Sequence, residues 1–384
     1  MKIALAHRRL DRRGGTELDF YRTAIGLRDR GHEVHLFCSE IAIDPPSGIH
    51  MHSIPTFPLG RTARLWSFAK LAPKIIRRFP CEVVVSFDRM ISQDVLRSGG
   101  GSHRVFLQKL AEEGGLRRRM WHDLSLYHRS VLALERRQFQ AGHYKRILAV
   151  SEEVKRELLD TYALPEDKVT VIYNGVDEER FNLSLRDKFR ELVRGQWHIP
   201  LDAPTVLFVG SGFRRKGLDR LLKAWNSPQL KDTYLIVVGD DAQRGRYQAL
   251  AEDWTHRKAI FVGRRDDVES YYGAADLLAL PAVQEAFGNV VLEALAAGLP
   301  ALVSRTVGAS EILKGRLAEG IIPHPEDPNA MAGRLLAMLE RGRDSSFSLE
   351  ARKLAEEYSW SKHFKKLDRF LKDTVEQSGC ASTS

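Results

Sequence analysis

Short apolar runs alternate with longer amphipathic segments along the first half of the chain. Residues 2–7 form the first run, Gly14 and Gly15 follow in a turn, and residues 16–30 then carry apolar side chains at helical spacing. Three more runs predict buried strands: residues 33–38, 82–87 and 146–150. Strands that alternate with helices in this way predict a parallel, doubly wound sheet.

A second series of the same kind begins near residue 170. Residues 169–173 are typical of a strand, and the turn from Asn174 to Asp177 that ends it is the expected entry to a second domain. Strands are then predicted over residues 205–210, 234–239, 259–263, 276–281 and 301–304, with helices over 217–225, 268–275 and 290–297. The predicted fold class is α/β, with Rossmann-like domains over residues 1–170 and 171–359 whose strand ends face each other across a cleft.

The C-terminal segment, residues 347–375, has helical periodicity that is interrupted near Ser359 and Trp360. We expect the helix over residues 360–376 to pack back on the first domain, and residues 377–384 to form a disordered tail. No apolar run reaches the ~20 residues that span a bilayer, and the N-terminal run is too short for a signal peptide. The three cysteines are far apart and show no metal-ligand spacing, so we expect a cytoplasmic protein without a metal site.

The net charge of +9 is concentrated in one region. Residues 104–146 contain ten Lys or Arg against four Asp or Glu, interleaved with aliphatic and aromatic side chains. This mixture indicates a helix lying on an anionic membrane surface; the alternative is an amphipathic helix packed on the first domain with its arginines in solvent. A nucleic-acid-binding protein is a rival from another class, but no helix-turn-helix, zinc-finger or RNA-recognition signature supports it.

Two carboxylates and two cations predict the chemistry of the second domain. Glu285 precedes a helix that starts near Gly288, and Glu293 lies more than a turn inside it. The free N–H groups of a first helical turn hold anions, and carboxylates accept hydrogen bonds from sugar and ribose hydroxyls. Arg215 and Lys216 supply the cations that a diphosphate requires. Together these side chains predict a site for a nucleotide sugar.

The glycines around these cations exclude two other nucleotide-binding motifs. Gly210, Gly212 and Gly217 superficially resemble a phosphate loop, but the lysine precedes the last glycine and Leu218 stands where Ser or Thr is needed. The spacing also fails the Rossmann dinucleotide fingerprint. We therefore exclude an NTPase and a dehydrogenase, and keep a non-catalytic binder of sugar nucleotides and a sugar-nucleotide epimerase as weaker alternatives.

These motifs resemble glycosyltransferase family 4, with its two-domain GT-B fold, over nearly the whole chain. The likeness is carried by the turn at Gly14, the turn after Asn174, the segment that ends at Gly217 and, above all, residues 285–300. Residues 14–20, the basic stretch after residue 103 and residues 210–217 point further to the lipopolysaccharide core glucosyltransferase I group.

The resemblance implies a role for each residue of the site. Arg215 and Lys216 would hold the donor diphosphate and stabilise the charge that builds on it during transfer. Glu285 would contact hydroxyls of the transferred sugar, and Glu293 would bind the ribose. The donor would also meet Gly14, Gly15, Gly212, and the N–H groups near Phe287, Gly288 and Asn289. Members of the family retain anomeric configuration and need no metal or cofactor.

Asp19 and His103 are the catalytic candidates on the acceptor side. Asp19 falls on the first helix, and His103 ends a glycine-rich loop, residues 99–103, that we expect to be flexible and to follow a helix. A general base needs a suitable pKa and hydrogen-bond reach; the alternatives are a charge on a helix face and an ordinary loop histidine. Related glucosyltransferases carry an Asp where this chain has Gly100, which leaves the acceptor-side residues open.

The function implied by the resemblance is the retaining transfer of a hexose, with UDP-glucose as the expected donor and the heptose-containing inner core of a lipopolysaccharide as acceptor. Such an acceptor is lipid-linked, so the enzyme would work at the inner face of the cell membrane, attached peripherally through residues 104–146. One alternative is transfer of N-acetylglucosamine, galactose or mannose to a different polysaccharide or glycolipid. The other is a basic nucleic-acid- or membrane-binding protein without catalysis.

Overall fold

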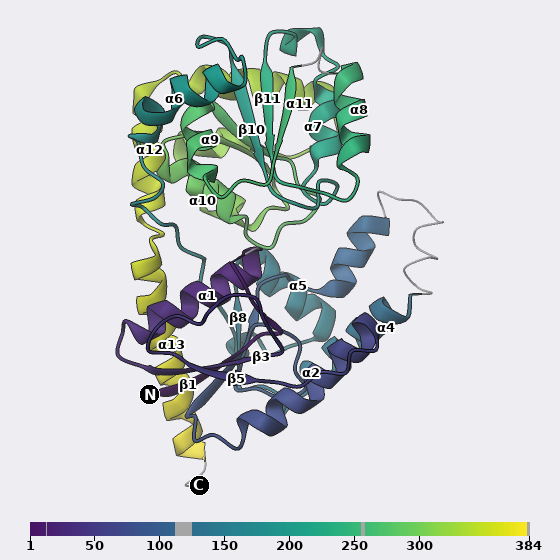
Figure 1. The fold of residues 1–384 in the computed structure, drawn as a ribbon, viewed down its shortest axis with the longest axis vertical. Coiled ribbons are helices and arrows are strands. Elements are labelled where there is room, and N and C mark those ends of the chain that lie inside the picture. The colour runs from purple at the N-terminus through teal and green to yellow at the C-terminus, as the bar shows by residue number, and fades with distance from the viewer. Residues whose placement is uncertain (13, 112–124, 255–257, 382–384) are drawn as a thin grey trace. The chain divides into compact units, whose positions relative to one another are not determined.

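The computed structural model describes residues 1–384 except 13, 112–124, 255–257 and 382–384. The chain divides into two compact units (Figure 1). Unit 1 comprises Met1–Tyr173 with Trp360–Ser384, and unit 2 comprises Asn174–Ser359. Each unit holds a parallel sheet with helices packed against it, so the predicted α/β class is confirmed.

In unit 1 the described strands form a seven-stranded parallel sheet in the order β5-β3-β1-β6-β7-β8-β9. The strands are β1 (Lys2–Ala6), β2 (Arg9–Leu10), β3 (Glu33–Cys38), β4 (Glu40–Ile41), β5 (His50–Ser53), β6 (Val83–Ser86), β7 (Val95–Ser98), β8 (Arg146–Ala149) and β9 (Val169–Val171), of which β2 and β4 pair only with each other. The helices are α1 (Gly15–Arg28), α2 (Gly60–Ile76), α4 (Leu126–Gln138), α5 (Glu152–Tyr162) and α13 (Trp360–Ala381); residues 103–111 are also helical.

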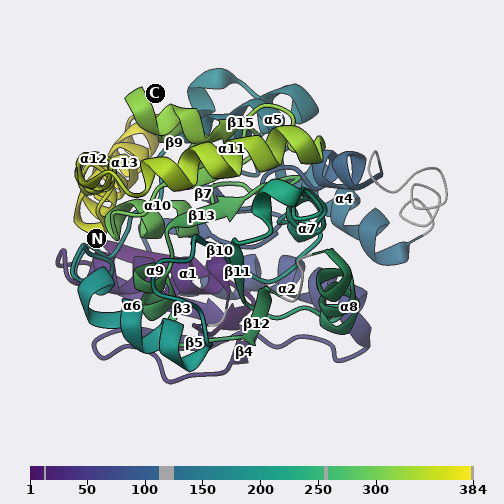
Figure 2. The same cartoon turned by 90° about the horizontal axis from the view of Figure 1, so that it is seen from above.

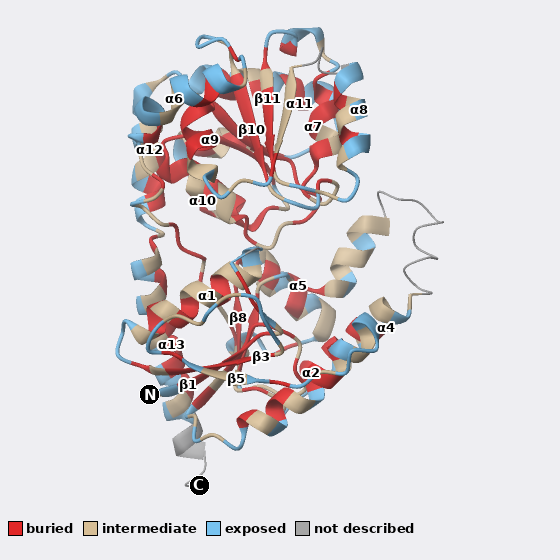
Figure 3. Cartoon of the chain, in the orientation of Figure 1, coloured by how far each residue is buried: buried red, intermediate tan, exposed pale blue. Residues whose placement is uncertain are grey.

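The sheet of unit 1 is buried on both faces, which explains why its strands read as unbroken apolar runs. On β1, Ile3 and Leu5 join a core formed with α1 and α13, whereas Ala4 and Ala6 join a second core formed with α2. Figure 3 shows this burial along the central strands. Helix α5 begins as expected, since the hydroxyl of Ser151 accepts the N–H of Val154 at 3.1 Å and caps it.

The C-terminal helix corrects one prediction. Residues 377–381, which we expected to be disordered, continue α13 as far as Ala381. The helix goes on because no proline interrupts it, and a single glycine such as Gly379 costs only about 1 kcal/mol. Residues 382–384 of the predicted tail lie outside the described residues. The helix packs against α1 within unit 1.

In unit 2 the described strands form a six-stranded parallel sheet in the order β12-β11-β10-β13-β14-β15. The strands are β10 (Thr205–Val209), β11 (Tyr234–Val238), β12 (Ala259–Gly263), β13 (Leu277–Leu280), β14 (Ala301–Ser304) and β15 (Ile321–Ile322). The helices are α6 (Leu185–Gln196), α7 (Leu218–Ala224), α8 (Arg244–Trp254), α9 (Val268–Ala274), α10 (Asn289–Ala296), α11 (Pro328–Arg341) and α12 (Ser345–Glu356). Helix α7 packs with α8 and α11, whereas α9 packs with α6, and Figures 1 and 2 show these sets on opposite faces of the sheet.

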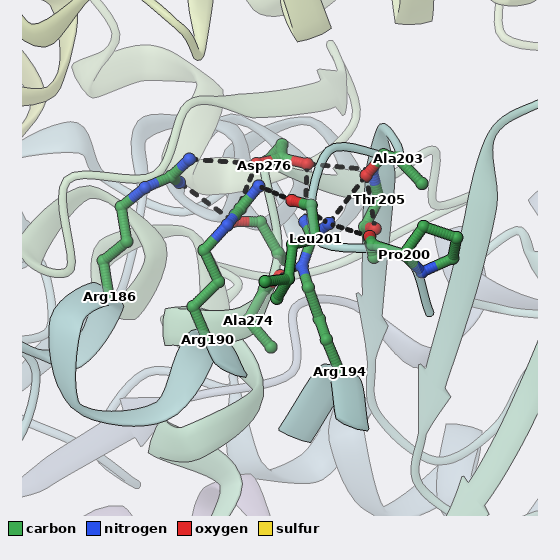
Figure 4. A network of polar contacts seen from close by, with 10 residues as sticks. Arg186, Arg190, Arg194, Pro200, Leu201, Ala203, Thr205, Ala274 and Asp276 are labelled. Atoms are coloured by element: carbon green, nitrogen blue, oxygen red, sulfur yellow. Dashed lines mark hydrogen bonds and ion pairs between the residues drawn. The ribbon is translucent and has the colours of Figure 1, made fainter. Parts of the chain in front are cut away.

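A buried ion network fastens α6 to the sheet of unit 2 (Figure 4). Arg186, Arg190 and Arg194 follow one another at single-turn spacing, and all three donate to the carboxylate of Asp276, at 3.3, 2.8 and 2.8 Å. The backbone N–H of Thr205 donates to the same carboxylate at 3.0 Å. Burial alone would raise the pKa of Asp276, but the arginine charges outweigh it and lower the pKa. The network therefore stays ionised and holds the starts of two strands together.

Candidate functional site

The two predicted cations lie in the loop between β10 and α7 of unit 2. Gly217 ends this loop with φ of +78°, and a Cβ on it would collide with the carbonyl oxygen of Pro281. Beside this contact, the N–H of Val283 donates to the carbonyl oxygen of Arg215 at 2.9 Å. The glycine thus allows the loop after β10 to touch the segment after β13, which is the carboxyl end of the neighbouring strand.

Arg215, Lys216 and Glu285 form one charged cluster at this contact. Nη1 of Arg215 lies 2.7 Å from Oε2 of Glu285, and Nζ of Lys216 lies 3.2 Å from the same oxygen. Burial by itself would raise the pKa of Glu285, but Lys216 and Arg215 outweigh it and bring the pKa down to about 2. Glu285 is therefore a carboxylate at neutral pH, and two cations share its single negative charge. The cluster keeps a net positive charge, as an anion-binding site requires.

Glu285 is held in place by its backbone. Its N–H donates to Thr306 at 3.2 Å and its carbonyl oxygen accepts from Gly308 at 2.9 Å, which forms a parallel bridge with the segment after β14. The helix predicted to follow begins as expected, because Gly288 has φ of +93° and precedes α10. Phe287 is buried, and its carbonyl oxygen accepts from the N–H of Ala309 at 2.7 Å. At the first residue of α10, Oδ1 of Asn289 accepts from Nδ2 of Asn174 at 2.8 Å.

Glu293 lies on α10, one turn further along, and is half-buried. The hydroxyl of Tyr272, on α9, donates to Oε2 of Glu293 at 2.7 Å. Burial, and then the charge of Glu293, raises the pKa of Tyr272 well above its usual value. Tyr272 is therefore a permanent donor that orients the carboxylate. Sequence reasoning missed this tyrosine, because nothing in residues 268–275 ties it to a carboxylate on another helix.

Gly14, Gly15 and Asp19 all lie at the start of α1 in unit 1. Gly14 directly precedes the helix and Gly15 opens it. Asp19 is on this helix as predicted, but it is buried rather than solvated, and its Oδ2 lies 3.0 Å from Nη2 of Arg97, on β7. The pair is nearly inaccessible to solvent. Asp19 thus has a cationic partner 78 residues away that its own sequence neighbourhood does not reveal.

The surroundings of His103 differ from those we predicted. The glycine-rich residues 99–101 follow strand β7 rather than a helix, and His103 opens the helical residues 103–111. Its N–H donates to Oε2 of Glu135 at 3.2 Å, and its Nε2 lies 3.0 Å from Nδ1 of His128. Glu135 is itself buried and binds Arg89 and Tyr162. His103 is therefore held at a helix start by contacts from α4, so the prediction of a flexible loop was wrong at this residue.

A cavity of about 240 Å³ opens in unit 1 beside the carboxyl ends of its central strands. It is smaller than the pockets of about 300–1,000 Å³ that hold drug-sized ligands. Its charged and polar lining residues, none of which we predicted, are His7, Arg8, Thr16, Glu17, Asp88, Arg89, Arg97, Ser98, Glu135 and Gln138. The signal was present in part, since His7 comes directly after β1 and Asp88 comes two residues after the end of β6.

His7 is the most unusual residue of this cavity. It is buried, and neither ring nitrogen has a hydrogen-bond partner in the part of the chain that the structure describes. The carboxylates of Asp88 and Glu17 lie 3.7 and 4.0 Å from its ring nitrogens, beyond hydrogen-bond distance. Burial lowers the pKa of His7 more than these two carboxylates raise it. A neutral imidazole with an acceptor nitrogen therefore lines the cavity.

The basic stretch, residues 104–146, is described in part, and its residues 112–124 lie outside the described residues. Helix α4 packs against α2, and Arg129, Arg136 and Arg137 of α4 are exposed. Among the described residues, no helix is both apolar enough and long enough to traverse a bilayer.

Two family models match the chain in succession. The model described as Glycosyltransferase Family 4 matches residues 13–180, and the model described as Glycosyl transferases group 1 matches residues 203–341. The second match contains Arg215, Lys216, Glu285 and Glu293, and the first contains Asp19.

Individual proteins are similar over most of the chain. The lipopolysaccharide glucosyltransferase WaaG of Escherichia coli (strain K12) is 29% identical over 316 residues, which are 81% of this chain and 82% of that protein. A crystal structure of WaaG, a glycosyltransferase involved in lipopolysaccharide biosynthesis, superposes with a TM-score of 0.80 at 26% identity, covering 95% of this chain and 98% of the other. Anabaena Alr3699/HepE in complex with UDP-glucose shares the fold, with a TM-score of 0.72 at 17% identity over 97% of this chain and 100% of that one.

Proposed function

Since the chain belongs to the GT-B glycosyltransferases, we propose that it transfers glucose from UDP-glucose to the heptose-containing inner core of a lipopolysaccharide. The sugar and the acceptor class are supported by the similarity to the E. coli lipopolysaccharide glucosyltransferase. The binding of the donor is supported by one observation, the half-buried cluster in which Arg215 and Lys216 share Glu285.

The donor diphosphate binds at this cluster. A third of the Arg215 side chain is exposed, so its guanidinium can reach a ligand. Lys216 is buried beside it and adds a second positive charge. Both cations then stabilise the negative charge that builds on the diphosphate as the glycosidic bond breaks, which removes the need for a metal ion. The N–H groups at the start of α10, near Phe287, Gly288 and Asn289, add partial positive charge. Gly212, with its positive φ, leaves the loop after β10 without a side chain at that position.

The two carboxylates select the sugar and the nucleoside. Glu285 is ionised and accepts hydrogen bonds from hydroxyls of the transferred hexose. Glu293, with one oxygen held by Tyr272, accepts from the ribose diol. Ionised carboxylates accept hydrogen bonds and cannot donate them, so each one recognises hydroxyl groups.

The acceptor sugar binds in the cavity of unit 1. Neutral His7 accepts a proton or hydrogen bond from an acceptor hydroxyl, and Asp88 lies close enough to stabilise the imidazolium that forms. Asp19 acts through its ion pair with Arg97, which it holds at the cavity wall, and His103 fixes the start of the helix beside it. Gly14 and Gly15 keep the approach to the start of α1 free of side chains.

The protein binds the inner membrane face peripherally through residues 104–146 and the neighbouring start of α2. The guanidinium of Arg61, on α2, lies over the ring of Tyr127, on α4, at 4.4 Å. Next to this contact, Leu59 is 81% and Leu126 is 68% exposed. Large exposed apolar side chains beside arginines match an anionic lipid surface. In flotation with liposomes, binding should require anionic lipid and weaken in Leu59→Ser with Leu126→Ser; indifference to lipid charge would remove this part of the proposal.

A transfer assay tests the proposed reaction. The purified protein is supplied with a lipopolysaccharide acceptor ending in inner-core heptose and with UDP-glucose, UDP-galactose, UDP-N-acetylglucosamine or GDP-mannose in turn. We expect transfer from UDP-glucose in the presence of EDTA, with an α-linked product by NMR. Transfer from another donor alone would replace glucose in the proposal, and a β-linked product or a strict metal requirement would overturn the retaining, metal-independent reaction.

A further inference from the structure

A cluster of imidazoles lies at the opposite ends of the strands from the cavity of unit 1. Glu33 opens β3 and His35 follows two residues later, so the side chains share one face of the sheet. His50 opens β5, and the register places it directly beside His35. The cavity residues instead follow the carboxyl ends of β1 and β6, so this cluster is separate from the proposed transfer site.

We propose that Glu33, His35 and His50 bind one divalent transition-metal ion. One carboxylate oxygen and two imidazole nitrogens, one from each residue, all lie within 4.8 Å of one another. Tetrahedral zinc has bonds of about 2.0–2.1 Å to such ligands. The ring of exposed His50 stacks on that of His35 at 4.7 Å, so His50 completes the set by turning one ring nitrogen toward the ion. Two imidazoles and a carboxylate suit Zn²⁺ and its neighbours in the first row rather than Mg²⁺ or Ca²⁺, which prefer oxygen.

The contacts of His35 supply the orientation that a metal ligand needs. Its Nε2 lies 3.0 Å from Oε1 of Glu33, and its Nδ1 lies 2.9 Å from Nε2 of His52. With a metal ion on Nε2, the remaining proton sits on Nδ1 and is donated to His52, as ligating histidines usually do to an outer acceptor. Phe79 packs on the ring of His52 at 4.2 Å and fixes it.

The charged groups beside the cluster leave one carboxylate oxygen of Glu33 to bind a cation. Lys2, on the neighbouring strand β1, binds Oε2 of Glu33 at 3.3 Å and leaves Oε1 for the ion. When His35 donates from Nδ1, its Nε2 is an acceptor that faces Oε1 of Glu33 at 3.0 Å. A cation between these two atoms removes their repulsion. Because His50 is exposed, the ion can enter from solvent and retain a water ligand.

The site would stabilise the edge of the sheet. In the described sheet β5 pairs only with β3, and the two strands contribute His50 and His35 to the same ion. An ion that binds the folded chain alone stabilises it by an amount that rises with the logarithm of the ion concentration relative to the dissociation constant. Zinc should therefore raise the melting temperature of the protein without taking part in glycosyl transfer.

Calorimetry with the full-length, EDTA-treated and dialysed protein tests the site. We expect uptake of one Zn²⁺ per chain, visible absorption bands when Co²⁺ is used instead, and a rise in melting temperature with Zn²⁺. His50→Gln, at an exposed position that leaves the fold intact, should lower the affinity more than tenfold and abolish the bands. His52→Leu should lower affinity about 10–100-fold, as loss of an outer acceptor does.

The control is His324→Gln, because exposed His324 also lies beside a carboxylate two residues away, Glu326 at 3.2 Å, but outside any three-ligand cluster of the described residues. This variant should bind zinc like the unaltered protein. Absence of uptake by the unaltered protein, or equal affinity in His50→Gln, would overturn the proposal, and glycosyl transfer is not needed as a readout.

Discussion

The Nζ atom of Lys216 lies 3.2 Å from Oε2 of Glu285, although the two residues belong to loops after different strands of unit 2. The lysine is buried, and the carboxylate fixes its position before any ligand arrives. Charges that are already in place when a reaction builds up negative charge stabilise it without reorganisation. In the function that we propose, the pair therefore links the packing of two neighbouring strands to the departure of a nucleoside diphosphate.

Lys216→Ala should reduce glycosyl transfer about 10²–10³-fold, because loss of one contact to a developing charge commonly costs that much. Glu285 keeps Arg215 as a partner at 2.7 Å, so the variant should fold with an unchanged circular dichroism spectrum. Lys223→Ala, at an exposed position on α7, is the matched control and should transfer normally. Near-normal turnover in Lys216→Ala would refute the site.

Glu285→Gln should reveal a pH-dependent contribution to stability. The pKa of Glu285 is about 2 in the folded chain against an ordinary value of 4.5. A lowered folded-state pKa contributes stability that is complete above the unfolded value and is lost as pH falls through the folded one. The difference in unfolding free energy between the unaltered protein and Glu285→Gln should thus be constant above about pH 5.5 and shrink toward pH 2. Urea unfolding at several pH values measures it, and a difference that grows on acidification would contradict the assigned pKa.

Asp276→Asn should destabilise unit 2 by about 3–5 kcal/mol, because it leaves the buried guanidinium of Arg194 without its counter-charge. Arg186→Gln is the control. Arg186 lies 3.3 Å from the same carboxylate but is 44% exposed, so its loss should cost only about 0–1 kcal/mol. Chemical denaturation of both variants measures the loss of unfolding free energy. Equal losses in the two variants would show that the network acts as a set of surface ion pairs.

Gly100→Asp should fold as stably as the unaltered protein. The residue lines the cavity of unit 1, and a Cβ built on it meets no heavy atom within 4 Å. The new carboxylate would enter the cavity that we assign to the acceptor, so the Michaelis constant for the acceptor should change while donor binding does not. Gly217→Asp is the contrasting variant, since its Cβ would meet the carbonyl oxygen of Pro281, and it should unfold at lower temperature. A large loss of stability in Gly100→Asp would contradict this description of the cavity.

Much of the fold could be predicted because local signals agree with the packing. Runs such as residues 83–85 are apolar on successive positions because the sheet is covered on both faces, and the hydroxyl of Ser151 caps α5 as its sequence position indicates. Arg215 and Glu285 were assigned to one site because a diphosphate needs cations and a sugar is recognised by carboxylates, but their direct contact at 2.7 Å was not predicted.

The features that could not be predicted depend on contacts between distant residues. Asp19 is buried because Arg97 comes from another strand, and His103 is ordered because Glu135 binds its N–H from α4. No periodicity or motif within one segment encodes such pairs. The same reason hid Tyr272 and the cavity around His7, which form only when several strand ends and helices are assembled.

Calorimetric titration of UDP-glucose into the purified protein and into Lys216→Ala tests the central claim most directly. The account predicts measurable heat with saturation at one donor per chain for the unaltered protein, and an affinity at least tenfold weaker for the variant. Absence of heat with UDP-glucose and with every other common UDP-, GDP- or ADP-linked sugar, or equal affinity in the two proteins, would contradict it.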